Sequence, residues 1–81
     1  DALIVFKTLS MAREWSKTVT KTEILKLKLI DFFNSGKLKL EYLEIVDDLT
    51  LKPIVTIQKN CTCCIAAFCG NVRLIDNMSL S

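Results

Sequence analysis

Histidine is absent from the 81-residue chain, and glycine and proline are scarce, with two glycines and one proline. Without histidine, the commonest general base of enzymes is missing. Two separate glycines cannot form a glycine-rich loop around a phosphate group. The serines Ser10, Ser16 and Ser35 therefore have no histidine partner to activate them as nucleophiles. From its residues alone, the chain shows no catalytic constellation.

Neither charge nor hydrophobicity is extreme. The chain has 11 basic and 9 acidic residues, a net charge of +2, which is too balanced to indicate binding to nucleic acid or an anionic membrane. Its longest uncharged stretch, residues 60–72, is shorter than the ~20 apolar residues of a membrane-spanning helix. The chain opens with Asp1 and has no basic region before an apolar run, so we expect a fragment or processed product without a signal peptide.

Four cysteines lie close together in the segment CTCCIAAFC: Cys61, Cys63, Cys64 and Cys69. The Cys-x-x-Cys pair would need a second pair or histidines to hold zinc, and a redox pair normally opens a helix. Here the pair enters β-type sequence, where neighbouring side chains point to opposite faces. We therefore interpret the cysteines as small buried hydrophobic residues in a reducing compartment, with a metal or redox role as the alternative.

Residues 2–15 are predicted to form a helix with apolar residues on two faces. One stripe consists of Ala2, Val5, Phe6, Leu9 and Ala12, and a second face consists of Ile4, Met11 and Trp15. A small two-layer domain is expected to bury only one of these faces. We therefore expect the second face to form an exposed patch and to promote a dimer through Trp15.

A second helix is predicted over residues 21–34. Thr20 and Glu23 have the spacing of a capping box, Val19 and Ile24 could form a hydrophobic staple across it, and Gly36 follows where a helix would end. The segment ILKLKLI alternates as a strand would, but the punctuation at both ends favours a helix. Four apolar residues would then share a face: Leu25, Leu29, Phe32 and Phe33.

The rest of the chain reads as β-structure. Around residues 39–47, Leu43 and Ile45 would face one side of a strand, and Tyr42 and Glu44 the other. A turn closed by Pro53 follows, and then residues 54–57 form a short apolar stretch.

Two further strands flank Gly70-Asn71, a pair suited to a two-residue hairpin turn. This turn sets a register of Phe68 opposite Arg73, Ala66 opposite Ile75 and Ala67 opposite Leu74. We expect Leu74 to pack with Ala67, Ile65 and Val72, and Arg73 and Asp76 to lie on opposite faces. The predicted fold class is α+β, with two helices packed on an antiparallel sheet of about three strands that ends in a β-hairpin.

Acidic residues gather near one strand end: Glu41, Glu44, Asp47 and Asp48. Such a group is a candidate Mg²⁺ or acid–base site. A solvated strand edge and turn is the favoured interpretation, because edge strands commonly carry charges.

Several motifs of the second half occur in the order and spacing of a known enzyme family. They are a Tyr-x-Glu-x-x-Asp strand, a Thr-Leu-x-Pro turn, a small-residue strand ending in glycine, and a closing Arg-Leu-Ile-Asp-Asn. They comprise Tyr42, Glu44, Asp47, Thr50, Leu51, Pro53, Ala66, Ala67, Gly70, Arg73, Leu74, Ile75, Asp76 and Asn77. On these residues the chain resembles the C-terminal domain of the pantothenate synthetase (pantoate–β-alanine ligase) family. The helical half fits more loosely.

The resemblance implies that residues 1–81 are a single C-terminal lid domain of a larger enzyme whose N-terminal nucleotide-binding domain is absent. Enzymes of this family use ATP, with Mg, to activate pantoate as an adenylate. Attack by β-alanine then gives pantothenate on the cytoplasmic route to coenzyme A. The family's two histidines and its phosphate-handling segment are not in this chain.

We therefore expect no catalytic, cofactor-binding or metal-binding residue on this domain, and no activity of the domain alone. Its expected partners are the nucleotide-binding domain and, in the complete enzyme, ATP, pantoate and β-alanine. The signature residues would have structural roles, with contact to the nucleotide-binding domain as the alternative for Asp76 and Asn77. Two other hypotheses stay open, an independent protein-binding module and a small metal or redox protein.

Overall fold

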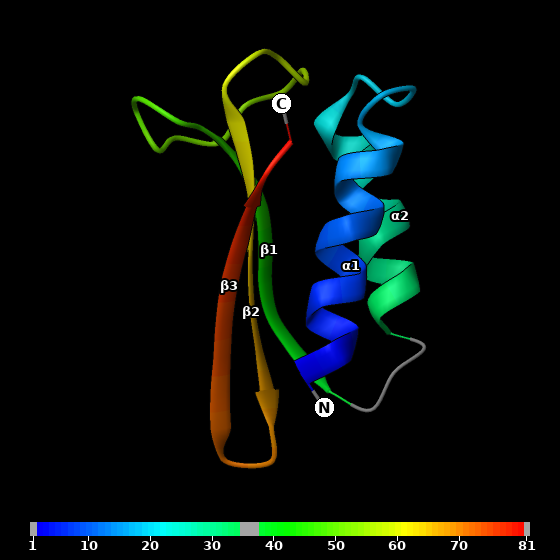
Figure 1. Cartoon of the computed structure of the whole chain (residues 1–81), viewed down its shortest axis with the longest axis vertical. Helices are drawn as coiled ribbons and strands as arrows, with labels where there is room; N and C mark the ends of the chain where they lie inside the picture. The colour runs from blue at the N-terminus through cyan, green and yellow to red at the C-terminus, as the bar shows by residue number, and fades with distance from the viewer. Residues whose placement is uncertain (1, 35–37, 81) are drawn as a thin grey trace.

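The computed structural model describes residues 2–34 and 38–80 of the chain. Helices α1 (Ala2–Trp15) and α2 (Thr22–Phe33) precede strands β1 (Lys39–Asp47), β2 (Cys61–Cys69) and β3 (Val72–Ser79). The strands form one antiparallel sheet in the order β1-β2-β3, and both helices lie side by side on one of its faces (Figure 1). The predicted α+β fold is confirmed.

Helix α1 has the predicted bounds and turns Val5, Leu9 and Ala12 into the core. Phe6 was expected to join this stripe, but its side chain is 56% exposed. Successive residues of a helix point about 100° apart, so the face that buries Val5 directs Phe6 away from the sheet. The side chain of Ala2 lies outside the described part of the chain.

The second face of α1 is the flank that meets α2, and the expected exposed patch is wrong. Ile4, Met11 and Trp15 are all half-buried and pack against the core. The Trp15 ring meets Phe32 edge-on, with centroids 6.3 Å apart, and the Lys28 ammonium lies 5.9 Å from its centroid. Because two helices share one face of the sheet, each buries one side on the sheet and one flank on its neighbour. The ground for a dimer through Trp15 is therefore lost.

Helix α2 begins through pairing with another part of the chain, and the predicted capping box is wrong. The N-cap is Lys21, and its side chain makes no capping hydrogen bond. The Thr20 carbonyl accepts from the Ile57 N–H at 2.6 Å, and the Thr22 hydroxyl donates to the Ile54 carbonyl at 2.5 Å. Residues 54–57 therefore hold the backbone on either side of Lys21, where the structure shows no side-chain cap, and Gly36 lies outside the described residues.

The sheet has the predicted faces and hairpin register. Leu43 and Ile45 are buried beneath the helices, whereas Tyr42 on the opposite face is 41% exposed. Phe68 pairs with Arg73, Ala66 with Ile75, and Ala67 with Leu74, as predicted. Within the turn only Gly70 has a positive φ, +61°, so the geometry is that of a type II′ turn.

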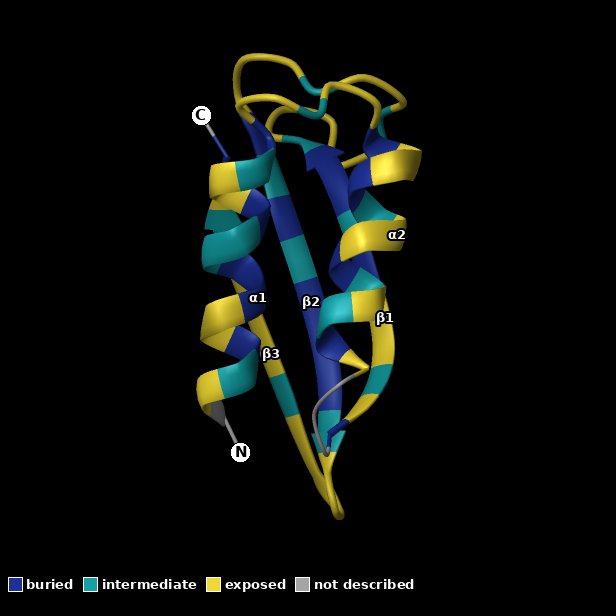
Figure 2. Ribbon diagram, turned by 90° about the vertical axis from the view of Figure 1, so that its right-hand side faces the viewer, coloured by how far each residue is buried: buried dark blue, intermediate teal, exposed yellow. Residues whose placement is uncertain are grey.

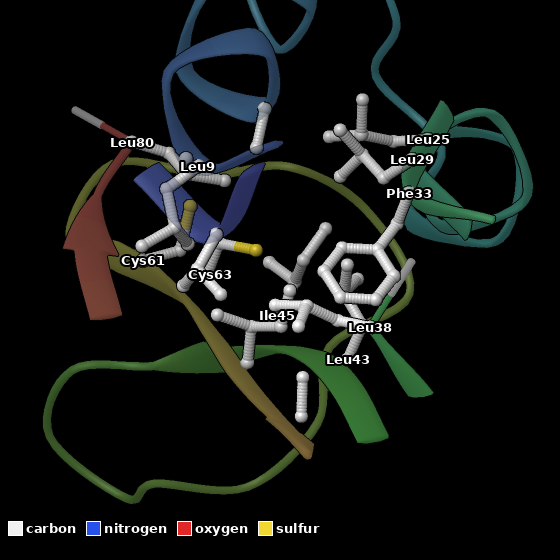
Figure 3. Packing of buried hydrophobic residues seen from close by; sticks show 14 residues of the cluster. Leu9, Leu25, Leu29, Phe33, Leu38, Leu43, Ile45, Cys61, Cys63 and Leu80 are labelled. Atoms are coloured by element: carbon white, nitrogen blue, oxygen red, sulfur yellow. The ribbon is translucent and has the colours of Figure 1, made fainter. Parts of the chain in front are cut away.

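The core lies between the helix layer and the sheet. Figure 3 shows Leu9 of α1, Leu25, Leu29 and Phe33 of α2, and Ile45 of β1 meeting there. Val72 was expected to join Leu74 on this core, but it lies next to the hairpin turn and is 61% exposed. Val72 is the first residue of β3, and the hairpin end of the sheet extends past the helices (Figure 2).

Candidate functional site

The signature residues are distributed over four places and do not line one pocket. The open face of the sheet, which no helix covers, carries Tyr42, Arg73 and Asn77. The loop after β1 contains Pro53 and is held by Asp47, and the turn after β2 contains Gly70. Glu44 begins on the open face and reaches α2, and Asp76 shares the helix-side face with Leu74. The signature residues therefore make separate local contacts and do not converge on one site.

Arg73 lies on β3 and bonds to β1 across the middle strand. Its Nε donates to Glu41 Oε1 at 2.6 Å. The sheet register shifts between Leu40 and Tyr42, so Glu41 is the extra residue of a bulge, and such a residue can be re-aimed across the sheet. Arg73 and Asp76 lie on opposite faces, as predicted.

Glu44 joins the sheet to the helix layer. Its Oε1 accepts from Lys26 Nζ at 2.9 Å and from the N–H of Ile45 at 3.3 Å. The Ile45 carbonyl in turn accepts from the N–H of Ile54 at 3.1 Å. The outer edge of β1 is therefore covered by side-chain and loop contacts, which protect it from pairing with another chain.

Asp47 organises the loop that follows β1. Its Oδ2 accepts from the Thr50 N–H and its Oδ1 from Gln58 Nε2, both at 3.0 Å. Its carbonyl accepts from the Leu51 N–H at 2.8 Å. Hydrogen bonds to the carboxyl group of Asp47 hold its pKa below the ordinary value of 3.8. The largest effect comes from the Thr50 N–H, followed by the Thr50 hydroxyl, the Leu49 N–H and the Gln58 side chain.

The acidic residues around the end of β1 have separate partners. Glu41 bonds to Arg73, Glu44 to Lys26, and Asp48 accepts the Thr62 hydroxyl. Among the residues that the structure describes, no three cysteine or acidic side chains come close enough to hold a metal ion. The solvated strand edge and turn is therefore the interpretation that this geometry supports.

The cysteines are free thiols on different faces of β2. Cys61 and Cys63 are fully buried on the helix side, Cys64 is half-buried on the other face, and Cys69 is exposed beside the turn. Burial raises the pKa of the Cys63 thiol to about 12, and burial also raises that of Cys64. A redox cysteine needs a stabilised thiolate, so these raised pKa values argue against that role for Cys63 and Cys64. The expected burial is confirmed for Cys61 and Cys63, but it is wrong for Cys69, which is exposed because it lies next to the hairpin turn.

Near the end of β3, Asp76 and Asn77 make one local contact. The Asn77 N–H donates to the Asp76 carboxylate at 2.8 Å. Both side chains are exposed. The contact restrains one backbone amide at the free edge of the sheet.

Two surface features were not predicted from the sequence. A groove of about 510 Å³ runs between α1 and the end of β3, lined by Phe6, Arg13, Met78 and Leu80 among others. The loop after β1 carries Leu49 and Leu51, which are 88% and 72% exposed. Leu51 also has a positive φ of +59°, for which a leucine in the sequence gives no signal.

Within residues 2–34 and 38–80, neither helix has the length and apolar character needed to cross a bilayer.

Comparison with known proteins places this arrangement in a family. The profile described as "Pantoate-beta-alanine ligase" matches residues 1–79. This chain is a member of the pantoate–β-alanine ligase family. It is 36% identical over 83 residues to the pantothenate synthetase of Fervidobacterium nodosum and 41% identical over 81 residues to that of Clostridioides difficile.

The chain spans only part of its relatives. The two alignments include 100% and 98% of this chain, but only 29% of the length of each pantothenate synthetase. Its fold resembles part of the crystal structure of pantothenate synthetase from Thermus thermophilus, with a TM-score of 0.84 over 95% of this chain and 28% of that one. At 20% identity this likeness shows the fold.

Proposed function

We propose that this domain is the lid of an ATP-dependent ligase that condenses pantoate with β-alanine to pantothenate in the cytoplasm. The observation that carries the proposal is the family match over residues 1–79, in a chain that spans 29% of a related synthetase. The reaction would pass through a pantoyl adenylate, and the nucleotide-binding part of the polypeptide would bind ATP and Mg.

The chemistry of the domain's own residues supports a covering role. The chain has no histidine, and the acidic side chains around the end of β1 (Glu41, Glu44, Asp47 and Asp48) have separate structural partners. An adenylate is readily hydrolysed, so a domain that closes over it and excludes water favours attack by the β-alanine amine. The lid therefore contributes to the reaction by protecting an intermediate formed elsewhere in the enzyme.

The signature residues enter this proposal as structural groups. Arg73 ties β3 to the bulge of β1, Glu44 ties β1 to α2, and Asp47 holds the loop that covers the edge of β1. Gly70 supplies the positive φ of the hairpin turn. These contacts would keep the lid rigid while it moves as one body.

A chimera tests the proposal. Residues 1–79 would replace the matched segment of Clostridioides difficile pantothenate synthetase, and pantothenate and AMP would be measured separately from ATP, pantoate and β-alanine. We expect the chimera to form both products together. The same enzyme without the matched segment should form no pantothenate, or should release AMP without forming pantothenate.

The matched control is a chimera with Ile45→Asp, which places a charge at a fully buried position and should behave like the truncated enzyme. The isolated 81-residue chain should show no turnover. A folded but inactive chimera, or turnover by the isolated chain above a protein-free blank, would contradict the proposal. Retained activity in the truncated enzyme would favour an independent binding module.

A further inference from the structure

The loop between β1 and β2 presents two leucine side chains to solvent. Leu49 is 88% exposed and Leu51 is 72% exposed, so neither contributes much to the core of this domain. They lie in the turn that begins at Asp47, and this turn projects from the sheet at the end opposite the start of α1 (Figure 1). We call Leu49 and Leu51 the loop tip.

The backbone of the loop tip is held in a costly conformation. Leu51 has a φ of +59°, in the left-handed region that leucine rarely adopts. A leucine there is strained, and a glycine would relieve the strain. Within the domain this strain is not offset by burial of the Leu51 side chain.

Hydrogen bonds fix the loop tip in this shape. Asp47 bonds through its carbonyl to the Leu51 N–H and through its carboxylate to the Thr50 N–H, at 2.8 and 3.0 Å. The Thr50 hydroxyl accepts from the Lys52 N–H at 3.3 Å, and Gln58 holds the second Asp47 oxygen at 3.0 Å. An apolar contact that is already ordered loses little conformational entropy when it binds.

We infer that the loop tip is a docking element that inserts Leu49 and Leu51 into an apolar depression on the rest of the same ligase polypeptide. The inference rests on the proposed function and adds the contact by which the lid is held closed. Strained backbone conformations cluster at binding and switch sites, where the surrounding structure maintains them.

The small apolar area of the loop tip favours a contact within one polypeptide over a contact between two copies of the chain. A stable dimer buries about 1,200 Å² or more in total, and two leucine side chains offer far less surface. A contact within one polypeptide needs less, because the connection raises the effective concentration of the two surfaces. The related synthetases are long enough to supply that surface, since the matched segment is 29% of their length.

The loop tip lies where a contact could hold the lid in its closed position. The domain measures 34 Å along its longest axis, and the loop tip and the start of α1 lie in opposite halves of that length (Figure 1). A lid joined to the rest of the enzyme next to α1 moves farthest at the other end. A contact at that end therefore distinguishes the closed arrangement from the open one.

Cysteine accessibility tests the docking without relying on turnover. Leu49→Cys would be introduced in the isolated chain and in the chimera, and its alkylation rate followed by peptide mass spectrometry in the presence of ATP, pantoate and β-alanine. We expect at least ~10-fold slower alkylation in the chimera than in the isolated chain. Leu27→Cys, at a position on α2 that is 64% exposed, is the matched control and should react equally in both.

Equal rates for Leu49→Cys in both proteins would overturn the inference, and so would concentration-dependent protection in the isolated chain, which would indicate a dimer. An inactive chimera with a protected position 49 would support docking and contradict the proposed activity. An active chimera with an unprotected position 49 would contradict docking alone.

Leu51→Gly separates docking from a structural role. In the isolated chain it should raise Tm, because glycine adopts the positive φ without strain. In the chimera it should lower the ratio of pantothenate to AMP, because the apolar contact is lost. A lower Tm of the isolated chain, or an unchanged product ratio in an active chimera, would overturn the role of Leu51 in docking.

Discussion

Arg73 and Glu41 join the two outer strands of the sheet over the middle one, with Nε and Oε1 2.6 Å apart. The Arg73 side chain is 46% exposed and the Glu41 side chain is 36% exposed, so water screens the pair. Exposed ion pairs contribute up to about 1 kcal/mol. The pair therefore serves mainly to fix the bulged part of β1 against the hairpin.

For this pair we predict that Arg73→Gln and Glu41→Gln each lower the free energy of unfolding by about 1 kcal/mol or less. The double variant should cost no more than the larger single change, because both remove the same contact. Urea unfolding of the four proteins at low salt measures this coupling. Additive costs would show that the two residues act independently.

The core contribution of α2 is tested by two leucines of the same helix. Leu29 is fully buried and Leu27 is 64% exposed. Leu29→Ala should lower the free energy of unfolding by about 2–5 kcal/mol, through lost burial and the cavity that remains. Leu27→Ala should change it by about 0.5 kcal/mol or less. Equal losses in thermal or urea unfolding would place α2 in another orientation.

The Asp47 loop should depend on acid pH. The folded-state pKa of Asp47 lies below its ordinary value of 3.8, so the carboxylate favours the folded loop above that pH, and this contribution is lost as the pH falls through the lower folded pKa. An NMR titration of the Thr50 amide should therefore show a midpoint below 3.8. Asp47→Asn is the control and should abolish the transition. A midpoint above 3.8 would contradict the hydrogen bonds described for Asp47.

The thiols should differ in reactivity along one strand. Cys69 is exposed, whereas Cys63 is buried with its pKa raised to about 12. At pH 8 alkylation should therefore modify Cys69 readily and Cys63 only when the chain unfolds. Rapid modification of Cys63 in the folded protein would contradict its burial.

The raised pKa of Cys63 also predicts a loss of stability in alkali. The neutral thiol favours the folded state fully below the ordinary pKa of 9.0, and this contribution declines as the pH rises from 9.0 towards about 12. Urea unfolding of the wild type and Cys63→Ala at several alkaline pH values measures it. The variant should lose less stability over that interval, and parallel curves would contradict the prediction.

The sequence by itself determined the helices and the register of the hairpin. Leu25 and Leu29 repeat at helical spacing, so burying them selects a helix although the local pattern alternates. The two-residue turn at Gly70-Asn71 fixes which residues pair, because a shift by one residue would turn every side chain to the other face. Both features depend on residues that are close together in the chain, so the sequence pattern is sufficient to predict them.

Only the tertiary structure decided the contacts between distant segments. Trp15 became half-buried because α2 lies beside α1, and α2 begins at Lys21 without a side-chain cap, where the Thr20 carbonyl accepts from the distant Ile57 N–H. Arg73 met Glu41 because a bulge displaced one residue of β1. The positive φ of Leu51 is likewise imposed by its loop. Each outcome depends on which surfaces the packed layers bring together, and no periodic pattern in the sequence encodes that.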